Sequence, residues 1–476
     1  MINQAVSGLI NFYLKKKYIK SKDIIYCINN ISSRLHTNLL YVNNAKPNLY
    51  ESLELIVNYA IDNNVIEDYF YQKDSLESEI TNIFLDKPSV VQENFESTDP
   101  IFAYKKFYNQ CIDSNYIKLK ELKKNVYYKQ TVGNNQIEIS INLAKPEKDP
   151  KEIAKLKKVK SSNYPKCPLC IENVGYAGSI NQSARINHRV IELKLNNQDW
   201  FFQYSPYLYY DFHCILIEKQ HNDMHVTDDT IKVQIDFVDK FSDFFIGNNA
   251  ALPIVGGSIL NHNHFQGGIH KFAINFAKPV FKLCIDEVEI EYLDWHLATI
   301  QLRSKSKASI ISKVNTIKNN WESYSDKEII NNGNNALNFI SRKSGLIYEV
   351  IIILRNNSTS SEYPNGVYHP NEKYFHLKKE NIGLIEAMGF AVLPARLVKE
   401  LEDVKLFITQ NKTIEESIHY DWAKEIKEAY QNQDIDEFLK ENVAKRFVEI
   451  LKCCNVFKNS TNIELIIDKL LIQEKK

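Results

Sequence analysis

The segment GGSILNHNHFQGG holds four of the chain's 14 glycines, together with two histidines and a glutamine. Glycine gives up the most backbone freedom on folding, so a glycine-poor chain uses it where the backbone must come close to something. Side chains alternate between the two faces of a strand, so His262, His264 and Gln266 are predicted to share one face. Amide-rich turns bind anions, so Gly256 and Gly257 are predicted to approach a phosphate. The alternative is a polar edge strand with glycines as bulges.

The overall composition limits the class of protein. A chain of 476 residues is too long for one core, and 44% hydrophobic and 12% aromatic residues suit a folded enzyme. Lysine plus arginine equals aspartate plus glutamate at 59 each, which argues against a nucleic-acid or membrane-surface protein. No apolar run is long enough to span a membrane, and the N-terminus lacks the basic start of a signal peptide. Eight cysteines in a chain this long form no disulfide framework, so a cytoplasmic location is expected.

The pattern along the chain predicts three parts: a helical region over 1–150, a first sheet-containing unit over 151–330, and a second such unit with a helical C-terminus over 331–476. In the first part, ESLELIVNYAIDN has helical spacing and QIEISINLAKP alternates as a strand does. The proline- and lysine-rich stretch at 145–166 is predicted to be an exposed connection with a short helix.

The middle part is predicted to contain strands and one good helix. RVIELKL, WFFQYSPYLYY and FHCILIEKQH read as strands, and GGSILNHNHFQGG as a strand returning beside them. Thr227 or Asp228 can cap a helix whose apolar positions continue to Phe245, with 247–249 ending it. In the last part, LIYEVIIILRNN reads as a buried strand and NIGLIEAMG as the start of a helix.

A C-x-x-C pair, Cys167 and Cys170, is typical of one half of a tetrahedral zinc site. The other half must come from histidines, because the sequence has no second C-x-x-C. His221 is the best placed and His225 the next, with one of the two histidines of GGSILNHNHFQGG as a possible fourth ligand. The alternatives are two ordinary reduced cysteines or a redox pair.

These segments together resemble the galactose-1-phosphate uridylyltransferases, a branch of the histidine-triad superfamily, and more specifically their second, bacterial class. The resemblance lies in INLAKPEKDPKEIA, YPKCPLCIENVGYAG, FQYSPYLYYDFHCILIEKQH, GGSILNHNHFQGG, IILRNNSTSSEYPNGVYHP and HLKKENIGLIEAMGFAVLPARL, in this order along the chain. It implies an α+β fold with two histidine-triad-like antiparallel-sheet units and packed helices, preceded by a helical N-terminal region.

The resemblance also implies a reaction. His264 would attack the α-phosphorus of UDP-glucose to give a uridylyl-histidine and glucose 1-phosphate, and galactose 1-phosphate would then accept the uridylyl group. This is the transfer step of the Leloir pathway of galactose metabolism. A neutral imidazole is a competent nucleophile, and covalent catalysis divides one difficult displacement into two easier ones. Gln266 would bond a phosphate oxygen, and Ser258 with the glycine amides would hold oxygens on which charge develops.

In the first class of the family, two cysteines, a distant histidine and the first histidine of the pair bind zinc. Carried over to this sequence, the resemblance implies zinc ligands at Cys167, Cys170, His221 and His262. The metal would position His262 and so aim His264. This sequence departs from the first class in two ways. Asn263 stands where the first class has a proline between the histidines. The first class also has phosphate-binding arginines upstream of the cysteine pair, whereas here the only arginine before Cys167 is Arg34.

Other residues are predicted to contact substrate. Arg185 or Arg189 would replace the missing arginines, and Asn249 is a further candidate. KKENIGLIE resembles the segment that reaches the hexose hydroxyls, although a plain helix start explains it equally well. The remaining candidates are Lys379, Gly383 and Glu386 in this segment, and Glu362, Tyr363 and His369 in a polar loop.

Two other functions compete with the uridylyltransferase. A dinucleoside polyphosphate phosphorylase would use His264 on another nucleotide, and a zinc-stapled nucleotide- or RNA-binding protein would have no turnover. The neutral net charge disfavours the second, and Gln266 disfavours a hydrolase. The expected partners are the small molecules UDP-glucose and galactose 1-phosphate, with no nucleic acid or membrane, and a homodimer is the expected assembly.

Overall fold

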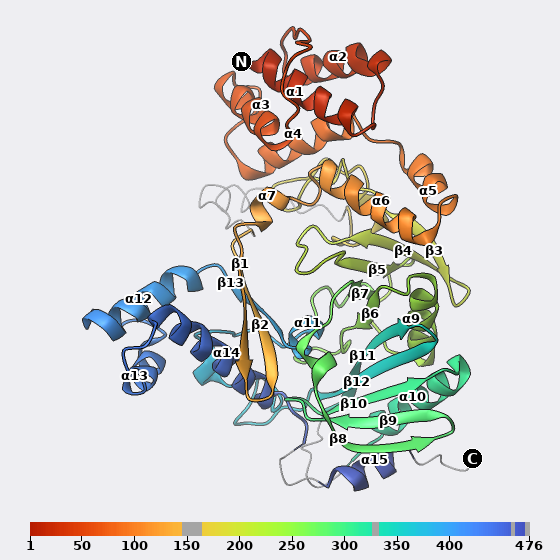
Figure 1. Ribbon diagram of the computed structural model, residues 1–476, viewed down its shortest axis with the longest axis vertical. Helices are drawn as coiled ribbons and strands as arrows, with labels where there is room; N and C mark the ends of the chain where they lie inside the picture. The colour runs from red at the N-terminus through yellow and green to blue at the C-terminus, as the bar shows by residue number, and fades with distance from the viewer. Residues whose placement is uncertain (145–163, 326–332, 458–461, 472–476) are drawn as a thin grey trace. The chain divides into compact units, whose positions relative to one another are not determined.

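A computed structural model describes residues 1–144, 164–325, 333–457 and 462–471 of the chain (Figure 1). The chain forms two compact units. Unit 1 contains Met1–Lys123, Pro146–Leu193 and Asp199–Leu208, and unit 2 contains Lys124–Lys145, Lys194–Gln198 and Tyr209–Lys476. The α+β class with a helical N-terminal region is confirmed. The three-part domain division stays a prediction, and most of the connection expected at 145–166 lies outside the described residues.

Unit 1 is mainly helical. Its first helices pack around an apolar core in which Leu9, Ile10, Tyr13 and Ile31 are fully buried. The stripe predicted in ESLELIVNYAIDN is buried in this core too. The helices are α1 (Ile2–Lys15), α2 (Ile24–Arg34), α3 (Tyr50–Asp62), α4 (Phe70–Asn82), α5 (Pro88–Glu96), α6 (Pro100–Asp113) and α7 (Leu119–Leu122). Strands β3 (Ile191–Leu195) and β4 (Gln198–Tyr204), both predicted, lie largely in this unit.

Unit 2 is built on a large antiparallel sheet with the strand order β5-β7-β6-β11-β12-β10-β9-β8. Long apolar runs such as VIIIL in β12 are buried on both faces, as central strands covered by other layers must be. The strands are β5 (Cys214–Glu218), β6 (Phe245–Asn248), β7 (His264–Gly268), β8 (Pro279–Ile285), β9 (Val288–Leu293), β10 (Thr299–Ser304), β11 (Asn335–Ser344) and β12 (Ile347–Asn356).

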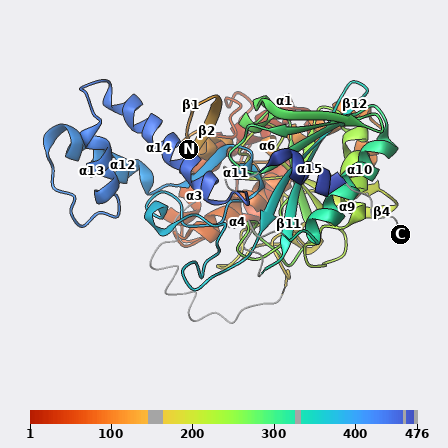
Figure 2. The ribbon, with the colours of Figure 1, turned by 90° about the horizontal axis from the view of Figure 1, so that it is seen from below.

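Helices cover this sheet. The helices α9 (Asp228–Lys240) and α10 (Lys307–Glu322) pack on its central strands, and α15 (Ile463–Leu471) packs on α10; the three lie together in Figure 2. The start of α9 is as predicted, because the Thr227 side chain accepts a hydrogen bond from the Asp229 amide. A smaller sheet pairs β1 (Val126–Val132), β2 (Asn135–Asn142) and β13 (Phe390–Pro394), and α14 (Ile435–Cys453) packs against it. The remaining helices are α11 (Leu384–Ala387), α12 (Leu397–Gln410) and α13 (Tyr420–Glu428).

Two predicted elements are wrong in extent. The helix expected to reach Phe245 ends at Lys240, and Phe245 begins β6 between β7 and β11. Phenylalanines at 241 and 245 fit helical spacing, but Phe245 is buried on the sheet. The strand expected over the whole of GGSILNHNHFQGG starts only at His264, because φ is positive at Gly256, Gly257 and Ile259. Extended strands do not tolerate such angles.

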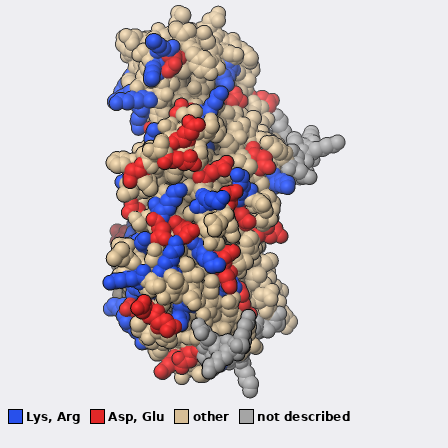
Figure 3. Space-filling model, turned by 90° about the vertical axis from the view of Figure 1, so that its right-hand side faces the viewer, with Lys and Arg blue, Asp and Glu red and all other residues tan. Residues whose placement is uncertain are grey.

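The surface carries both signs of charge. Figure 3 shows lysine and arginine interspersed with aspartate and glutamate on one face. Ion pairs between exposed side chains include Lys412 with Asp403 at 2.6 Å. Among the described residues, no helix has both the length and the apolar composition needed to cross a membrane.

Candidate functional site

Strand β7 holds the two residues predicted to do chemistry, His264 and Gln266, on one face. It lies between β5 and β6, with His264 opposite Ile217 and Gln266 opposite Ile215. Gly267 allows this close pairing, because a Cβ there would lie 2.5 Å from the carbonyl oxygen of Phe245. The local sequence therefore fixes both side chains on a central strand of unit 2.

Gly256 and Gly257 are also required by close packing of the chain. A Cβ on Gly256 would lie 2.1 Å from the carbonyl oxygen of Ile382, and one on Gly257 would lie 2.9 Å from the Cβ of Asn249. Both glycines also have positive φ, 137° and 120°. The sequence predicted that the backbone comes close to something at these glycines. In the structure, Gly256 comes close to another part of the chain, the turn that begins at Ile382. Contact of Gly256 and Gly257 with a phosphate stays a prediction.

The tautomer of His264 follows from its hydrogen bond. Its Nδ1 lies 2.8 Å from the carbonyl oxygen of His262, which can only accept, so Nδ1 carries the proton and Nε2 the lone pair. The ring is buried, with 3% of its surface exposed. Burial lowers the pKa of His264 to about 4, although the hydrogen bond to His262 opposes this. At neutral pH the side chain is a neutral imidazole with Nε2 as its nucleophilic atom.

Sequence reasoning missed His213, which precedes β5. It is buried, and burial lowers its pKa to about 3, with a smaller opposing effect from Gln266; neither ring nitrogen has a hydrogen-bond partner among the described residues. His213 lies two residues before Ile215, the partner of Gln266 across the β5–β7 pair. The alternation of FHCILIE would have placed His213 and Ile215 on one face, but without the register nothing linked them to Gln266.

The predicted metal ligands form two pairs, one in each unit. In unit 1, the Sγ atoms of Cys167 and Cys170 are 3.5 Å apart and buried. Asn173, which the sequence analysis missed, holds this turn because its Nδ2 donates to the carbonyl oxygens of both cysteines at 2.8 Å. The two thiols are therefore held together on a turn braced by hydrogen bonds.

In unit 2, the rings of His221 and His262 have their centroids 4.6 Å apart. His262 donates through Nε2 to the carbonyl oxygen of Glu218 at 2.9 Å, which leaves the lone pair on Nδ1, the form that binds a metal. His225, the alternative ligand, is exposed, and its Nδ1 hydrogen-bonds the carbonyl oxygen of Asp223. The thiols of unit 1 and the imidazoles of unit 2 are each donors of the kind that zinc prefers.

The segment predicted to contact the hexose contains a buried ion pair. Lys378 Nζ lies 2.7 Å from Glu386 Oε1, with only 10% and 9% of the two side chains exposed. Burial by itself would lower the pKa of Lys378, but the carboxylate of Glu386 raises it. Lys379, the lysine predicted to contact the hexose, is exposed, with its Nζ 5.9 Å from the centroid of the Phe375 ring, and that contact stays a prediction. The sequence could not distinguish the two adjacent lysines.

The other predicted contacts differ in how they are held. Asn249 is buried and accepts a hydrogen bond from the Leu384 amide at 3.0 Å, while Ser258 is exposed. Arg189 is buried and donates to Asn82 and to three carbonyl oxygens, so its guanidinium is already bonded within unit 1. Arg185 is partly exposed and donates to the Tyr116 hydroxyl at 2.6 Å. Of the two arginines, Arg185 is the better candidate for a phosphate contact. Gly383 caps α11, its amide 3.1 Å from Glu386 Oε2, and Glu362, Tyr363 and His369 lie in the loop after β12.

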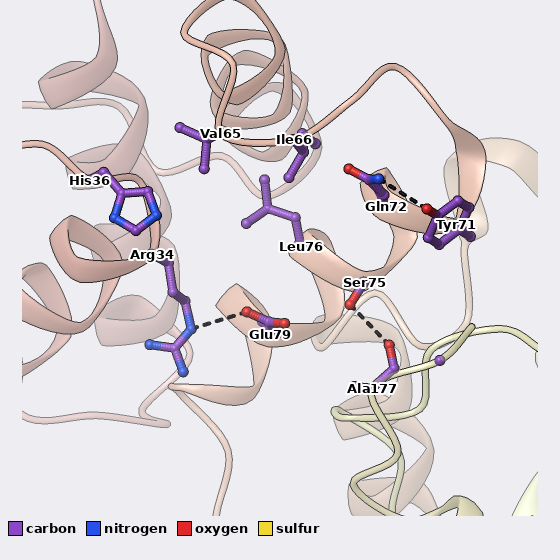
Figure 4. Close-up of a pocket in the computed structure, with 11 residues that line it drawn as sticks. Arg34, His36, Val65, Ile66, Tyr71, Gln72, Ser75, Leu76, Glu79 and Ala177 are labelled. Atoms are coloured by element: carbon purple, nitrogen blue, oxygen red, sulfur yellow. Dashed lines mark hydrogen bonds and ion pairs between the residues drawn. The ribbon is translucent and has the colours of Figure 1, made fainter. Parts of the chain in front are cut away.

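Unit 1 also has a cavity of about 410 Å³ between α2, α4 and the turn at Ala177–Gly178 (Figure 4). Arg34 lines it and lies 3.6 Å from Glu79, with His36 beside it in Figure 4. None of the residues predicted for the site lines this cavity.

Comparison with known proteins decides the family. The family model for the N-terminal domain of galactose-1-phosphate uridyl transferase matches residues 19–223, and the model for the C-terminal domain matches 236–424. The chain belongs to the galactose-1-phosphate uridyl transferase family. It is 41% identical to the galactose-1-phosphate uridylyltransferase of Clostridium perfringens, over 96% of each chain. The corresponding values for that of Clostridium acetobutylicum are 38% and 99%.

This result confirms the resemblance stated from the sequence, and with it a transferase of galactose metabolism. Among solved structures, yeast Ap4A phosphorylase Apa2 aligns over 71% of this chain and 98% of its own. The identity is 12% and the TM-score 0.34, so this similarity carries no argument.

Proposed function

We propose that this uridylyl transferase family member moves the uridylyl group from UDP-glucose to galactose 1-phosphate through a covalent bond to His264. The observation that carries the proposal is the hydrogen bond from His264 Nδ1 to the His262 carbonyl oxygen. It keeps a neutral imidazole in the tautomer that presents Nε2 to an electrophile. The substrates named are those of a uridylyltransferase, the activity for which the relatives are named.

In the first step, a bond forms between Nε2 and the α-phosphorus of UDP-glucose. The bond from this phosphorus to the bridging oxygen breaks, and glucose 1-phosphate leaves with that electron pair. In the second step, a phosphate oxygen of galactose 1-phosphate attacks the same phosphorus, and the P–N bond breaks to return the lone pair to Nε2. The proton stays on Nδ1 throughout, hydrogen-bonded to the His262 carbonyl oxygen, so His264 needs no external base.

Gln266 is proposed to donate its amide to a non-bridging phosphate oxygen. An amide cannot take or give a proton in such a reaction, so it favours transfer to a sugar phosphate over activation of water. Gly256, Gly257 and Ser258 are proposed to line the phosphate side. Arg185, Asn249, Lys379 and Glu386 complete the proposed substrate contacts.

A radioactive label on the α-phosphorus of UDP-glucose tests the central step. Wild-type protein, without galactose 1-phosphate, is expected to retain label that is stable in base and released by acid, as a phosphoramidate is. Adding galactose 1-phosphate should release it as UDP-galactose. His264→Asn should retain none, and His225→Asn, a change at an exposed histidine, should label as the wild type does. Retention of label by His264→Asn would refute the assignment.

We also propose that one zinc ion binds Cys167, Cys170, His221 and His262. The ion would hold His262 in place, and His264 with it, because His264 Nδ1 donates to the His262 carbonyl. Metal analysis of the purified protein should find close to one zinc per chain, and Cys167→Ser should lose it. Cys284→Ser, at an exposed cysteine, is the control and should keep it. Wild-type protein purified without zinc, or Cys167→Ser with its full content, would overturn this proposal.

The homodimer expected from the sequence stays a prediction, which sedimentation equilibrium would test.

A further inference from the structure

Arg355, near the end of β12, is an unusual buried charge. Its side chain is among the largest that are fully buried, with 1% of the residue's surface exposed. Within the described residues, it forms no ion pair with a carboxylate. Burial lowers its pKa, but an arginine stays protonated at neutral pH. Placing an uncompensated cation in the interior costs several kcal/mol in general, so the position calls for an explanation.

Its hydrogen bonds supply the first part of that explanation. Nη1 donates to Oδ1 of Asn338 at 3.2 Å, and Nη2 donates to the carbonyl oxygens of Val255 at 2.6 Å and Ile382 at 3.0 Å. Val255 directly precedes Gly256, and Ile382 directly precedes Gly383. Through Nη2, Arg355 thus connects two turns: the one proposed to bind phosphate, and the one that leads to Glu386.

The two turns also touch each other at the same place. The Cα of Gly256 faces the Ile382 carbonyl oxygen so closely that no Cβ fits between them. Asn249 ties the turns from another direction, because its Oδ1 accepts from the Leu384 amide and its Cβ packs against Gly257. Arg355 and Asn249 together hold the turn at Gly256–Ser258 against the turn at Ile382–Glu386.

The charges around Arg355 favour an anion. Lys378 pairs with Glu386, and Glu386 is also the carboxylate that acts on Arg355 through space. Lys378 also lies 3.6 Å from Glu380, whose side chain is 73% exposed, so Glu386 is the buried carboxylate that the two cations share. A phosphate group arriving at the Gly256–Ser258 turn would supply the missing negative charge, in an interior where such interactions are little screened.

We propose that Arg355 is a positioning residue of the transferase. It sets the spacing between the turn at Gly256–Ser258, which takes the phosphate, and the turn at Ile382–Glu386, which takes the hexose, and its charge is balanced by the bound phosphate. This inference rests on the proposed function. It makes the recognition of the sugar depend on a residue that touches neither substrate.

The test uses the full-length protein and Arg355→Lys, which keeps the charge but replaces the fork that bonds two carbonyl oxygens. The KM values for UDP-glucose and for galactose 1-phosphate are both expected to rise about tenfold, the equivalent of losing roughly one hydrogen bond of about 1.4 kcal/mol. The control is Arg446→Lys, which alters a buried arginine of the same unit that pairs with Glu425 and Glu449. It should lower the melting temperature and leave both KM values unchanged.

A double-mutant cycle with Glu386→Gln separates positioning from a merely structural role. If Arg355 places Glu386, the effect of Glu386→Gln on kcat/KM should be several-fold smaller in the Arg355→Lys background. Additive effects, or KM values as in the wild type, would overturn the proposal. Asn338→Ala is the second variant if Arg355→Lys folds poorly, because it keeps the arginine and removes one acceptor. It should raise both KM values by a smaller factor, and unchanged values would likewise refute the inference.

The labelling experiment keeps the two proposals apart. Arg355→Lys should still label at His264, only more slowly. If the wild type itself does not label, the proposed function has failed. If the wild type labels and Arg355→Lys matches it in every kinetic constant, only the role of Arg355 has failed.

Discussion

The contact between Gly256 and Ile382 yields a prediction that separates two explanations of the glycine pair. If the glycine serves only an approaching phosphate, Gly256→Ala should impair binding but not the folded protein. If it serves the packing of the chain, the substitution must destabilise unit 2. The structure supports the second outcome, because the new Cβ would lie 2.1 Å from a backbone oxygen that cannot simply rotate away.

The magnitude can be worked out from two costs. A non-glycine residue at a φ of 137° costs about 1–3 kcal/mol in backbone strain. Forcing a methyl group against packed backbone costs about 1–3 kcal/mol more. The control is Gly345→Ala, in the turn between β11 and β12, which has a φ of 58° and nothing within 4 Å of the new Cβ. It bears about 1–2 kcal/mol of strain and no clash.

Gly256→Ala is therefore expected to cost roughly 1–4 kcal/mol more than Gly345→Ala. At about 2 °C per kcal/mol for a unit of this size, the melting temperature should be roughly 2–8 °C lower than that of the control. Circular dichroism during heating measures both variants. A displaced Ile382 would also lose its bond to Arg355, so kcat/KM should fall in Gly256→Ala alone. Equal melting temperatures for the two variants would show that the turns do not pack as described.

Two further predictions concern unit 2. The Nδ1 atoms of the buried residues His376 and His419 are 2.9 Å apart, and burial lowers both pKa values, that of His376 to about 3. In the unfolded chain both histidines take up protons below about pH 6.5, whereas in the folded protein they stay neutral to lower pH. The contribution of both histidines to stability is therefore complete above about pH 6.5, and the free energy of unfolding falls toward pH 3 by at most about 1.4 kcal/mol per pH unit for each histidine. His376→Asn should flatten the fall in melting temperature between pH 6.5 and 4, and an unchanged slope would contradict the assignment. Lys378→Met, which leaves Glu386 buried without its partner, should destabilise the fold by about 3–5 kcal/mol in urea unfolding, whereas Lys379→Met should change it by less than about 0.5 kcal/mol. Similar losses for the two lysine variants would refute the importance of the pair.

Local patterns predicted much of the fold. Helical spacing located α3, alternation located β2, and continuous apolar runs located β5 and β12; the cap of α9 was also predicted. The apolar stripe of α3 is buried as its period requires, whereas β2 and β12 are buried on both faces. The end of α9 was missed, since the same phenylalanines satisfy the period of a helix and the burial of a central strand. The strand before His264 was overextended, since the turn geometry at 256–259 depends on contacts with residues far along the chain.

The sequence by itself determined the chemistry available to this protein. A histidine pair followed by a glutamine, and a C-x-x-C with distant histidines, are properties of residue type and spacing, which no fold can alter. Only the tertiary structure decided which groups serve the site and which serve the chain. Gly256 faces Ile382, Lys378 rather than Lys379 meets Glu386, and Arg355 joins two turns. These are contacts between segments remote in sequence, and burial gives them their energy, so no local pattern could have revealed them.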